Sequence, residues 1–146
     1  MNDAGRAGPG RRGSRERVLG LLYEADMSGV DPVEVLDAQT VAPDRYAREA
    51  VRGFAQAAPD VDAIIEDASH GWHLERMPRV DRALLRLATW ELAHRPDVPT
   101  GVILSEAVEL AKEYSTEDSG RFVNGVLAEI ARRTRPDAPA EDPTPA

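Results

Sequence analysis

Five arginines lie within the first 17 residues, and they are the side chains of this sequence best suited to chemistry. Two acids accompany them, so this segment carries a net charge of +3. The other residues hold 13 basic and 24 acidic side chains, which gives −11 there and −8 for the whole chain. Guanidinium groups bind phosphate in a bidentate manner and stack on bases. A basic arm on an acidic body therefore predicts local binding of a polyanion such as RNA. The arginines are Arg6, Arg11, Arg12, Arg15 and Arg17.

Composition divides the chain into three parts. Residues 1–13 contain four glycines and one proline among the arginines, so we expect a flexible RNA-binding arm. Residues 14–134 are expected to form one helical domain, and residues 135–146, with four prolines, a disordered acidic tail. Taken alone, the arm also allows a second interpretation, in which it is a disordered leader that only improves solubility.

Catalysis and metal binding find little support in the sequence. His70 and His73 stand three residues apart beside Glu66 and Asp67, which is half of a metal site, but nothing completes it. No phosphate-binding loop, dinucleotide-binding glycine motif or nucleophile elbow is present. We therefore predict that the protein is not an enzyme and needs no cofactor or metal.

The same composition bears on the location of the protein. The sequence contains no cysteine, which excludes disulfides and fits a reducing compartment. No apolar run approaches the roughly 20 residues that span a bilayer, and no apolar segment of a signal peptide follows the first arginines. We expect a cytoplasmic protein that does not enter a membrane.

Apolar residues recur with helical spacing along the whole central part, and no segment alternates as a strand would. The 146 residues are 42% hydrophobic, enough for one packed domain. We predict an all-α fold of about seven helices in two packed bundles joined near residues 72–78. A carboxylate within one apolar stripe, Glu106, needs a partner, and Arg86 is our candidate. The expected helix starts are Ser14, Asp31, Pro43, Pro59, Pro78, Thr100 and Ser115.

Two long segments resemble the NusB family of transcription antitermination factors. Residues 95–130 contain DVP, then EAVELAK, then DSGRFVNGVL, in the order and register of the family's C-terminal signature. RVDRALLRLATWEL at residues 79–92 and RERVLGLLYEA at residues 15–25 are similar to two further family helices. The resemblance covers about residues 11–133, and between residues 30 and 70 it is one of pattern only.

The resemblance implies a fold of two three-helix bundles and a function without catalysis or cofactor. Family members bind the boxA element of nascent ribosomal RNA together with NusE, which is also a small-subunit ribosomal protein. The complex then joins NusA, NusG and RNA polymerase and lets transcription pass premature terminators.

The resemblance also implies which residues of this chain meet the partners. Phe122 and Tyr23 have an alternative role in helix packing. Gly13 and Ser14 stand where relatives often have another arginine and a small apolar residue, which implies a looser grip by the arm. The residues implied for RNA are Arg11, Arg12, Arg15, Arg82, Asp118, Ser119 and Phe122, and those implied for NusE are Tyr23, Glu24 and Asp81.

Two rival interpretations remain at this point. NusB-like domains also form the N-terminal part of ribosomal RNA cytosine methyltransferases, but here a proline-rich tail follows, so that interpretation requires the chain to be a fragment. The second rival is an interaction module that forms a homodimer through the surface that would otherwise meet RNA. The mass of the protein in solution, with and without RNA, separates the second case.

Overall fold

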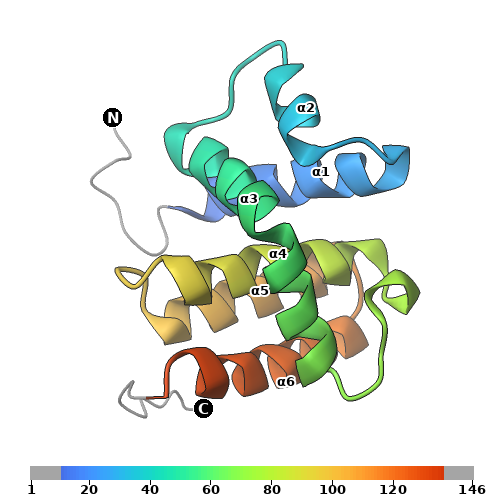
Figure 1. Ribbon diagram of the computed structural model, residues 1–146, viewed down its shortest axis with the longest axis vertical. Helices are drawn as coiled ribbons and strands as arrows, with labels where there is room; N and C mark the ends of the chain where they lie inside the picture. The colour runs from blue at the N-terminus through green and yellow to red at the C-terminus, as the bar shows by residue number, and fades with distance from the viewer. Residues whose placement is uncertain (1–10, 137–146) are drawn as a thin grey trace.

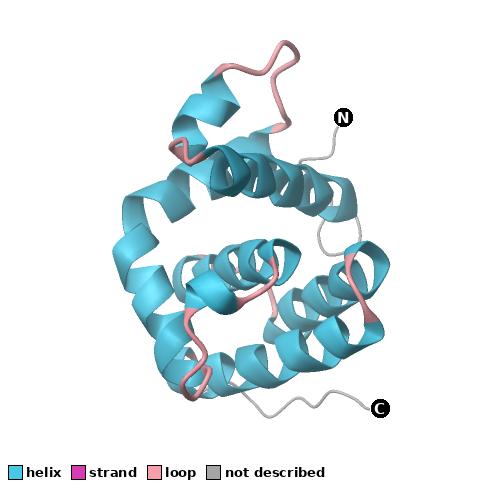
Figure 2. Ribbon diagram, turned by 90° about the vertical axis from the view of Figure 1, so that its right-hand side faces the viewer, coloured by secondary structure: helices cyan, strands magenta, loops and turns pink. Residues whose placement is uncertain are grey.

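The computed structural model describes residues 11–136, and within that range every regular element is helical. The predicted all-α fold is therefore confirmed, while the basic arm up to residue 10 and the tail from residue 137 lie outside the described residues (Figures 1 and 2). One short 3-10 helix, Leu74–Arg76, precedes the fourth α-helix. The α-helices are α1 (Arg12–Ser28), α2 (Pro32–Asp37), α3 (Arg45–Ala68), α4 (Arg79–His94), α5 (Thr100–Tyr114) and α6 (Glu117–Thr134).

The six helices form two layers, as the two-bundle prediction requires. Helices α1, α2 and α3 pack on one another, and so do α4, α5 and α6. The long helix α3 also contacts α4 and α6, and α1 contacts α4, so the bundles share one apolar core. Figure 1 shows α3 running from the upper bundle down across the lower one. None of the helices in residues 11–136 has the length and apolar character needed to cross a membrane.

The prediction of about seven helices is wrong by one, because the two helices expected at Pro43 and Pro59 are a single helix. Pro59 lies inside α3, where it lacks the N–H that would bond one turn back. The buried stripe nevertheless continues through this position without a change of register, from Val51 and Phe54 to Val61 and Ile65. Packing of that stripe against the second bundle outweighs the local cost of the proline.

The predicted helix starts divide into those with a side-chain cap and those without one. Asp31 accepts a hydrogen bond from the backbone of Val33, as predicted. The helix start expected at Pro43 has its cap one residue later, at Asp44, which accepts from the backbone of Tyr46 and Ala47. Ser14 does not cap α1, because the helix begins at Arg12 and the Ser14 hydroxyl donates to Asp44 at 2.6 Å. No side-chain cap starts α5, and Thr116 rather than Ser115 caps α6.

The two bundles fit closely where α3 crosses α4. A Cβ added to Gly53 would lie 2.4 Å from the ring of Trp90, so only glycine leaves room for the indole there. Trp90 is 6% exposed as a result. The end of α6 is tied to the end of α4 by the Arg135 guanidinium, which donates to the carbonyls of Glu91, Leu92, Arg95 and Val98 and to the Thr100 hydroxyl.

Candidate nucleic-acid interface

Arg12, an arginine of the predicted arm, lies on the surface in the first turn of α1. Its guanidinium pairs with Glu113 at 2.9 Å, Glu106 at 3.7 Å and Glu16 at 3.9 Å, and the side chain is 37% exposed. The hydrogen bond to Glu113 is the main cause that raises the pKa of Arg12. Exposed ion pairs contribute little free energy, so a phosphate can replace these carboxylates.

The prediction that Glu106 pairs with Arg86 is wrong. Arg86 binds the carboxylate of Asp62 through two hydrogen bonds of 2.9 and 3.0 Å, which joins α4 to α3. Glu106 lies on α5 and faces Arg12 instead. The pattern of apolar residues did not reveal which neighbour each polar side chain of α4 and α5 would meet.

Arg11 lies against an aromatic ring rather than against an acid. Its guanidinium carbon is 4.1 Å from the centroid of the Tyr46 ring, and Arg95 lies 4.8 Å from the same centroid. Such cation–π contacts are worth on the order of 0.5–1 kcal/mol at accessible sites. The start of the helix is thus held against α3, while the guanidinium of Arg11 remains available for exchange with another ligand.

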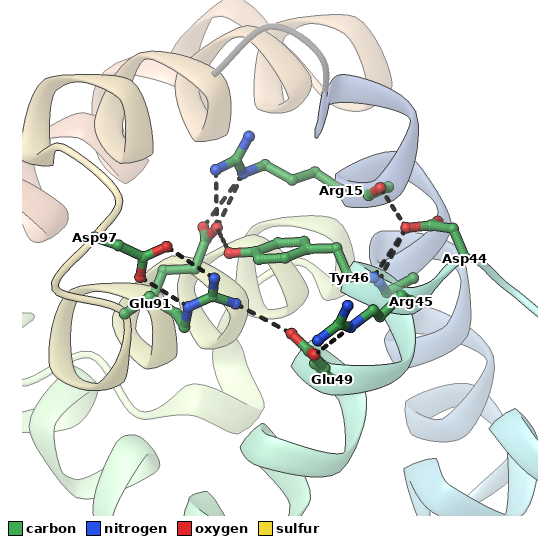
Figure 3. Close-up of polar contacts among 10 residues, drawn as sticks. Arg15, Asp44, Arg45, Tyr46, Glu49, Glu91 and Asp97 are labelled. Carbon is green, nitrogen blue, oxygen red and sulfur yellow. Dashed lines mark hydrogen bonds and ion pairs between the residues drawn. The ribbon is translucent and has the colours of Figure 1, made fainter. Parts of the chain in front are cut away.

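Arg15, the third arginine predicted to bind RNA, lies inside the protein. Arg15 and Glu91 are each 1% exposed and share three hydrogen bonds of 2.9 to 3.3 Å (Figure 3). The Tyr46 hydroxyl donates to the same carboxylate at 2.5 Å, and burial, with the charge of Glu91 as a further cause, raises the pKa of Tyr46. Arg15 therefore joins α1 to α4 and does not face solvent.

The predicted residues of α6 lie on both sides of its first two turns. The Asp118 side chain is 88% exposed and pairs with Arg121, whereas Ser119 is buried and bonds to the hydroxyls of its neighbours at the α5–α6 turn. Phe122 is half-buried, and its ring centroid is 6.0 Å from that of Trp72. Phe122 therefore combines the two roles considered for it: part of its ring packs against Trp72, and part is open to a ligand.

Of the three residues predicted to bind NusE, two are exposed and one is buried. Tyr23 and Glu24 are exposed on α1, but Asp81 is 2% exposed and its Oδ1 has no hydrogen-bond partner among the described residues. Burial raises the pKa of Asp81, and the hydroxyls of Ser119 and Ser115 act in the opposite direction. The carboxylate therefore lies where α4 meets the α5–α6 turn.

Arg82, predicted to reach RNA, also lies in the interior. It is 7% exposed and binds Asp26 at 2.7 Å and the Leu74 carbonyl at 2.7 Å. It therefore connects α4 with the end of α1 and with the 3-10 helix. Its charge is already compensated before any partner binds.

Sequence reasoning missed several large apolar side chains that lie on the surface, among them Val41 at 71% exposure, Met27 at 55%, Trp72 at 54% and Tyr114 at 49%. The exposure of Met27 was not foreseen, because Met27 lies near the end of α1, beyond Ala25, the last buried residue of that helix. The HGWH sequence around Trp72 did carry a signal, because a tryptophan beside a glycine in a connection has little chance of burial. That segment lies between α3 and the 3-10 helix.

The half metal site suggested by His70 and His73 is not extended by other residues. Among residues 11–136 no group of three possible ligands comes together, and His73 faces only Glu66, with 3.7 Å between Nδ1 and Oε2. His70 is exposed.

Comparison with known proteins gives consistent results for the sequence and the fold. Residues 12–132 match the model of the NusB family. The chain is 46% identical over 125 residues to the transcription antitermination protein NusB of Kineococcus radiotolerans, covering 83% of this chain and 92% of that protein. It is 44% identical over 143 residues to the protein of the same name from Acidothermus cellulolyticus, covering 92% and 99%.

Solved structures show the same similarity. A structure of NusB from T. maritima superposes with a TM-score of 0.75 at 36% identity, covering 84% of this chain and 90% of that one. The chain also superposes on a chain of a crystal structure of antitermination factors NusB and NusE in complex with dsRNA. That match has a TM-score of 0.73 at 30% identity and covers 84% of this chain and 96% of the other.

Proposed function

The chain belongs to the NusB family, and from this premise we propose that it is a transcription antitermination factor that binds boxA RNA of nascent ribosomal RNA together with NusE. The family consists of RNA-binding factors rather than enzymes, so membership confirms that the protein is not an enzyme. NusA, NusG and RNA polymerase would complete the assembly. Such a complex works on nascent transcripts, which places the protein in the cytoplasm.

The RNA-binding part of the proposal rests on the contacts that the guanidinium groups of Arg11 and Arg12 make at the start of α1. Arg12 pairs with two accessible carboxylates, Glu16 and Glu113, and with the mostly buried Glu106, and Arg11 lies on the face of the Tyr46 ring. Both guanidiniums can therefore transfer to phosphate at small cost, and the remaining arm residue of this type, Arg6, lies outside the described residues. Arg15 and Arg82 are left out of the proposed contact surface because their charges are buried and paired.

From α1 the proposed RNA surface continues over the turn between α5 and α6. Arg12 contacts Glu113 near the end of α5, and Ser115 in the turn bonds to Ser119 of α6. Asp118 and the exposed part of Phe122 follow on α6. Asp118 offers an acceptor to the base edges, and Ser119 positions the turn rather than meeting RNA directly.

For NusE we propose the exposed side of α1. Tyr23 and Met27 are one turn apart on α1 and are 37% and 55% exposed, and Glu24 lies beside Tyr23. Val30, 37% exposed, follows the end of the helix at Gly29. Exposed apolar side chains next to a charge are typical of a protein-binding surface. Arg82 supports this surface from within, since it binds Asp26 of α1, whereas Asp81 faces the turn between α5 and α6 instead.

The test is fluorescence anisotropy of a labelled boxA RNA and of a scrambled RNA, each with and without purified NusE. We expect NusE to tighten binding of boxA RNA and to leave the scrambled RNA weakly bound. Binding that ignores both sequence and NusE would contradict the proposal. Light scattering of the same samples reports whether the protein is a homodimer that RNA or NusE dissociates.

A further inference from the structure

We propose that the segment between α3 and α4 is a second RNA contact, a stacking site for one unpaired base formed around Trp72. This inference rests on the proposed RNA-binding function and adds a site to it. Its ligand is a single base of the bound RNA strand together with the phosphate attached to that nucleotide. No residue of this segment was assigned to RNA above.

Trp72 presents an aromatic surface that the core does not use. It is 54% exposed, whereas the other tryptophan, Trp90, is 6% exposed. Its ring contacts Phe122 of α6 in a tilted arrangement, with 6.0 Å between centroids and 57° between planes. This contact orients the indole and leaves more than half of the residue in solvent. Bases stack on such rings with about 1–3 kcal/mol per base, whatever their identity.

The backbone that carries Trp72 is held in one conformation. His70 has a φ of 52° and Gly71 a φ of 97°, so two successive residues adopt the left-handed region that side chains rarely occupy. The Ser69 hydroxyl donates to the Trp72 carbonyl at 2.7 Å. The Leu74 amide donates to Glu66 at 2.9 Å. An ordered site of this kind loses little conformational freedom when a ligand binds.

A depression of about 420 Å³ lies beside the ring, and its lining suits a nucleotide. The lining consists of His70, Gly71, Trp72, His73 and Arg76. Among the residues that the structure describes, no carboxylate lines the depression, although Glu66 lies 3.7 Å from the Nδ1 of His73. The indole offers a face to a base, and the Arg76 guanidinium and the imidazoles offer donors to its phosphate. Its volume is within the range of pockets that bind small organic groups.

The site is continuous with the RNA surface proposed above. Phe122, which touches Trp72, is one turn along α6 from Asp118 and follows the α5–α6 turn that begins beside Glu113 and Arg12. A strand that starts on the arginines of α1 and crosses this turn therefore reaches Trp72 next. This continuity favours RNA over a separate protein ligand for the depression.

Intrinsic fluorescence tests the proposal in the full-length protein. The chain has only two tryptophans, and because Trp90 is buried, changes caused by a ligand in solvent report on Trp72. We expect boxA RNA to quench the emission and to protect it from iodide, at the concentrations at which anisotropy shows binding. Trp72→Phe removes the exposed emitter, and its remaining signal should not respond to RNA.

Affinity variants give the second measurement. Loss of one stacked base corresponds to roughly a tenfold weaker complex for Trp72→Ala, and Trp72→Phe should recover part of it. Binding constants measured at several salt concentrations give a slope of log K against log salt. Arg76→Gln should make this slope less negative by about 0.7, the value of one phosphate contact on a single strand. Arg132→Gln, at the far end of α6, is the matched control and should change neither. Circular dichroism verifies that each variant keeps its helices.

The outcomes separate this inference from the proposed function. If the wild type binds no RNA, the proposed function fails and takes the inference with it. If it binds RNA while the Trp72 emission and the Trp72→Ala affinity stay unchanged, only the stacking site is overturned. Protection of Trp72 by NusE without RNA would also overturn it, because the depression would then hold a protein.

Discussion

Arg12 and Arg15 stand one turn apart on the same helix, and both pair with glutamates, yet their surroundings differ completely. The Arg12 side chain is 37% exposed and is shared among three carboxylates, while Arg15 and Glu91 are each 1% exposed and bind one another through several hydrogen bonds. We call these the exposed cluster (Arg12 with Glu16, Glu106 and Glu113) and the buried cluster (Arg15 with Glu91 and Tyr46).

The difference shows that exposure decides what an arginine of this protein does. In the exposed cluster water screens the pairs of Arg12 with Glu16 and Glu113, although Glu106 is only 16% exposed. Replacing one of the two accessible carboxylates by phosphate therefore changes the free energy little. In the buried cluster the charges have lost their water, and removing either partner leaves an uncompensated charge inside the protein. The exposed cluster therefore suits exchange with RNA, and the buried cluster suits attachment of α1 to α4.

The largest effect is expected from breaking the buried cluster with Glu91→Ala. The variant leaves the Arg15 guanidinium buried without a counter-charge, which should lower the free energy of unfolding by about 3–5 kcal/mol. Chemical denaturation measures it. Glu113→Ala, which removes a carboxylate from the exposed cluster, is the control and should stay within about 1 kcal/mol of the wild type. Equal losses in the two variants would refute the distinction between the clusters.

A smaller loss of stability is expected for Tyr46→Phe, which removes the 2.5 Å hydrogen bond to Glu91. Hydrogen bonds to charged groups contribute about 1.5–3 kcal/mol. Tyr114→Phe is the control, because its hydroxyl meets Glu16 at 3.3 Å on the surface, and denaturation should find it as stable as the wild type.

The pH dependence of the same variant sharpens the comparison. The pKa of Tyr46 is raised above its ordinary value of 10.0, so the folded protein holds the phenolic proton more tightly than the unfolded chain. This contribution is present below pH 10 and is lost as the pH rises above it. Between pH 9 and pH 11 the wild type should lose more stability than Tyr46→Phe. Parallel curves would show that burial and the Glu91 carboxylate do not raise the pKa of Tyr46 in the folded protein.

Arg12→Ala tests the exposed cluster through RNA. We expect weaker binding of boxA RNA. The slope of log K against log salt should become less negative by about 0.7, because one phosphate contact is lost. The free energy of unfolding should change by less than about 1 kcal/mol. Anisotropy at several salt concentrations and denaturation give the two quantities. Arg132→Ala removes a more exposed arginine, 69% against 37% for Arg12, at the end of α6, and should leave RNA binding as it was.

The smallest effect is expected from Glu113→Gln, which frees Arg12 from its nearest carboxylate at 2.9 Å. RNA affinity should rise by at most about fivefold, since an exposed ion pair is worth no more than about 1 kcal/mol. Glu109→Gln removes the same charge from α5 beside Lys112 instead. If both variants gain equally, the gain comes from net charge and not from release of Arg12.

The sequence by itself determined the class of fold and the local signals along the chain. Helical spacing of apolar residues predicted an all-α protein. Asp31 was correctly predicted as a helix cap, and the start of α3 was predicted to within one residue, because capping depends on residues within one turn. The charge of the arm, and the family motifs between residues 95 and 130, also lie within the sequence. Each of these signals involves neighbours along the chain.

Only the tertiary structure decided which polar residues face solvent. Arg15 meets Glu91 across 76 residues, Arg86 meets Asp62 rather than Glu106, and the hydrogen-bonding groups of Asp81 and Arg82 are turned inward. Pro59 stays inside α3 for a related reason, because its flanking apolar residues pack on the second bundle. The sequence around an arginine does not reveal whether its side chain pairs with an acid in the core or lies at the surface. Its role follows from the rotation and packing of whole helices, which is set by the free energy of burying the entire core.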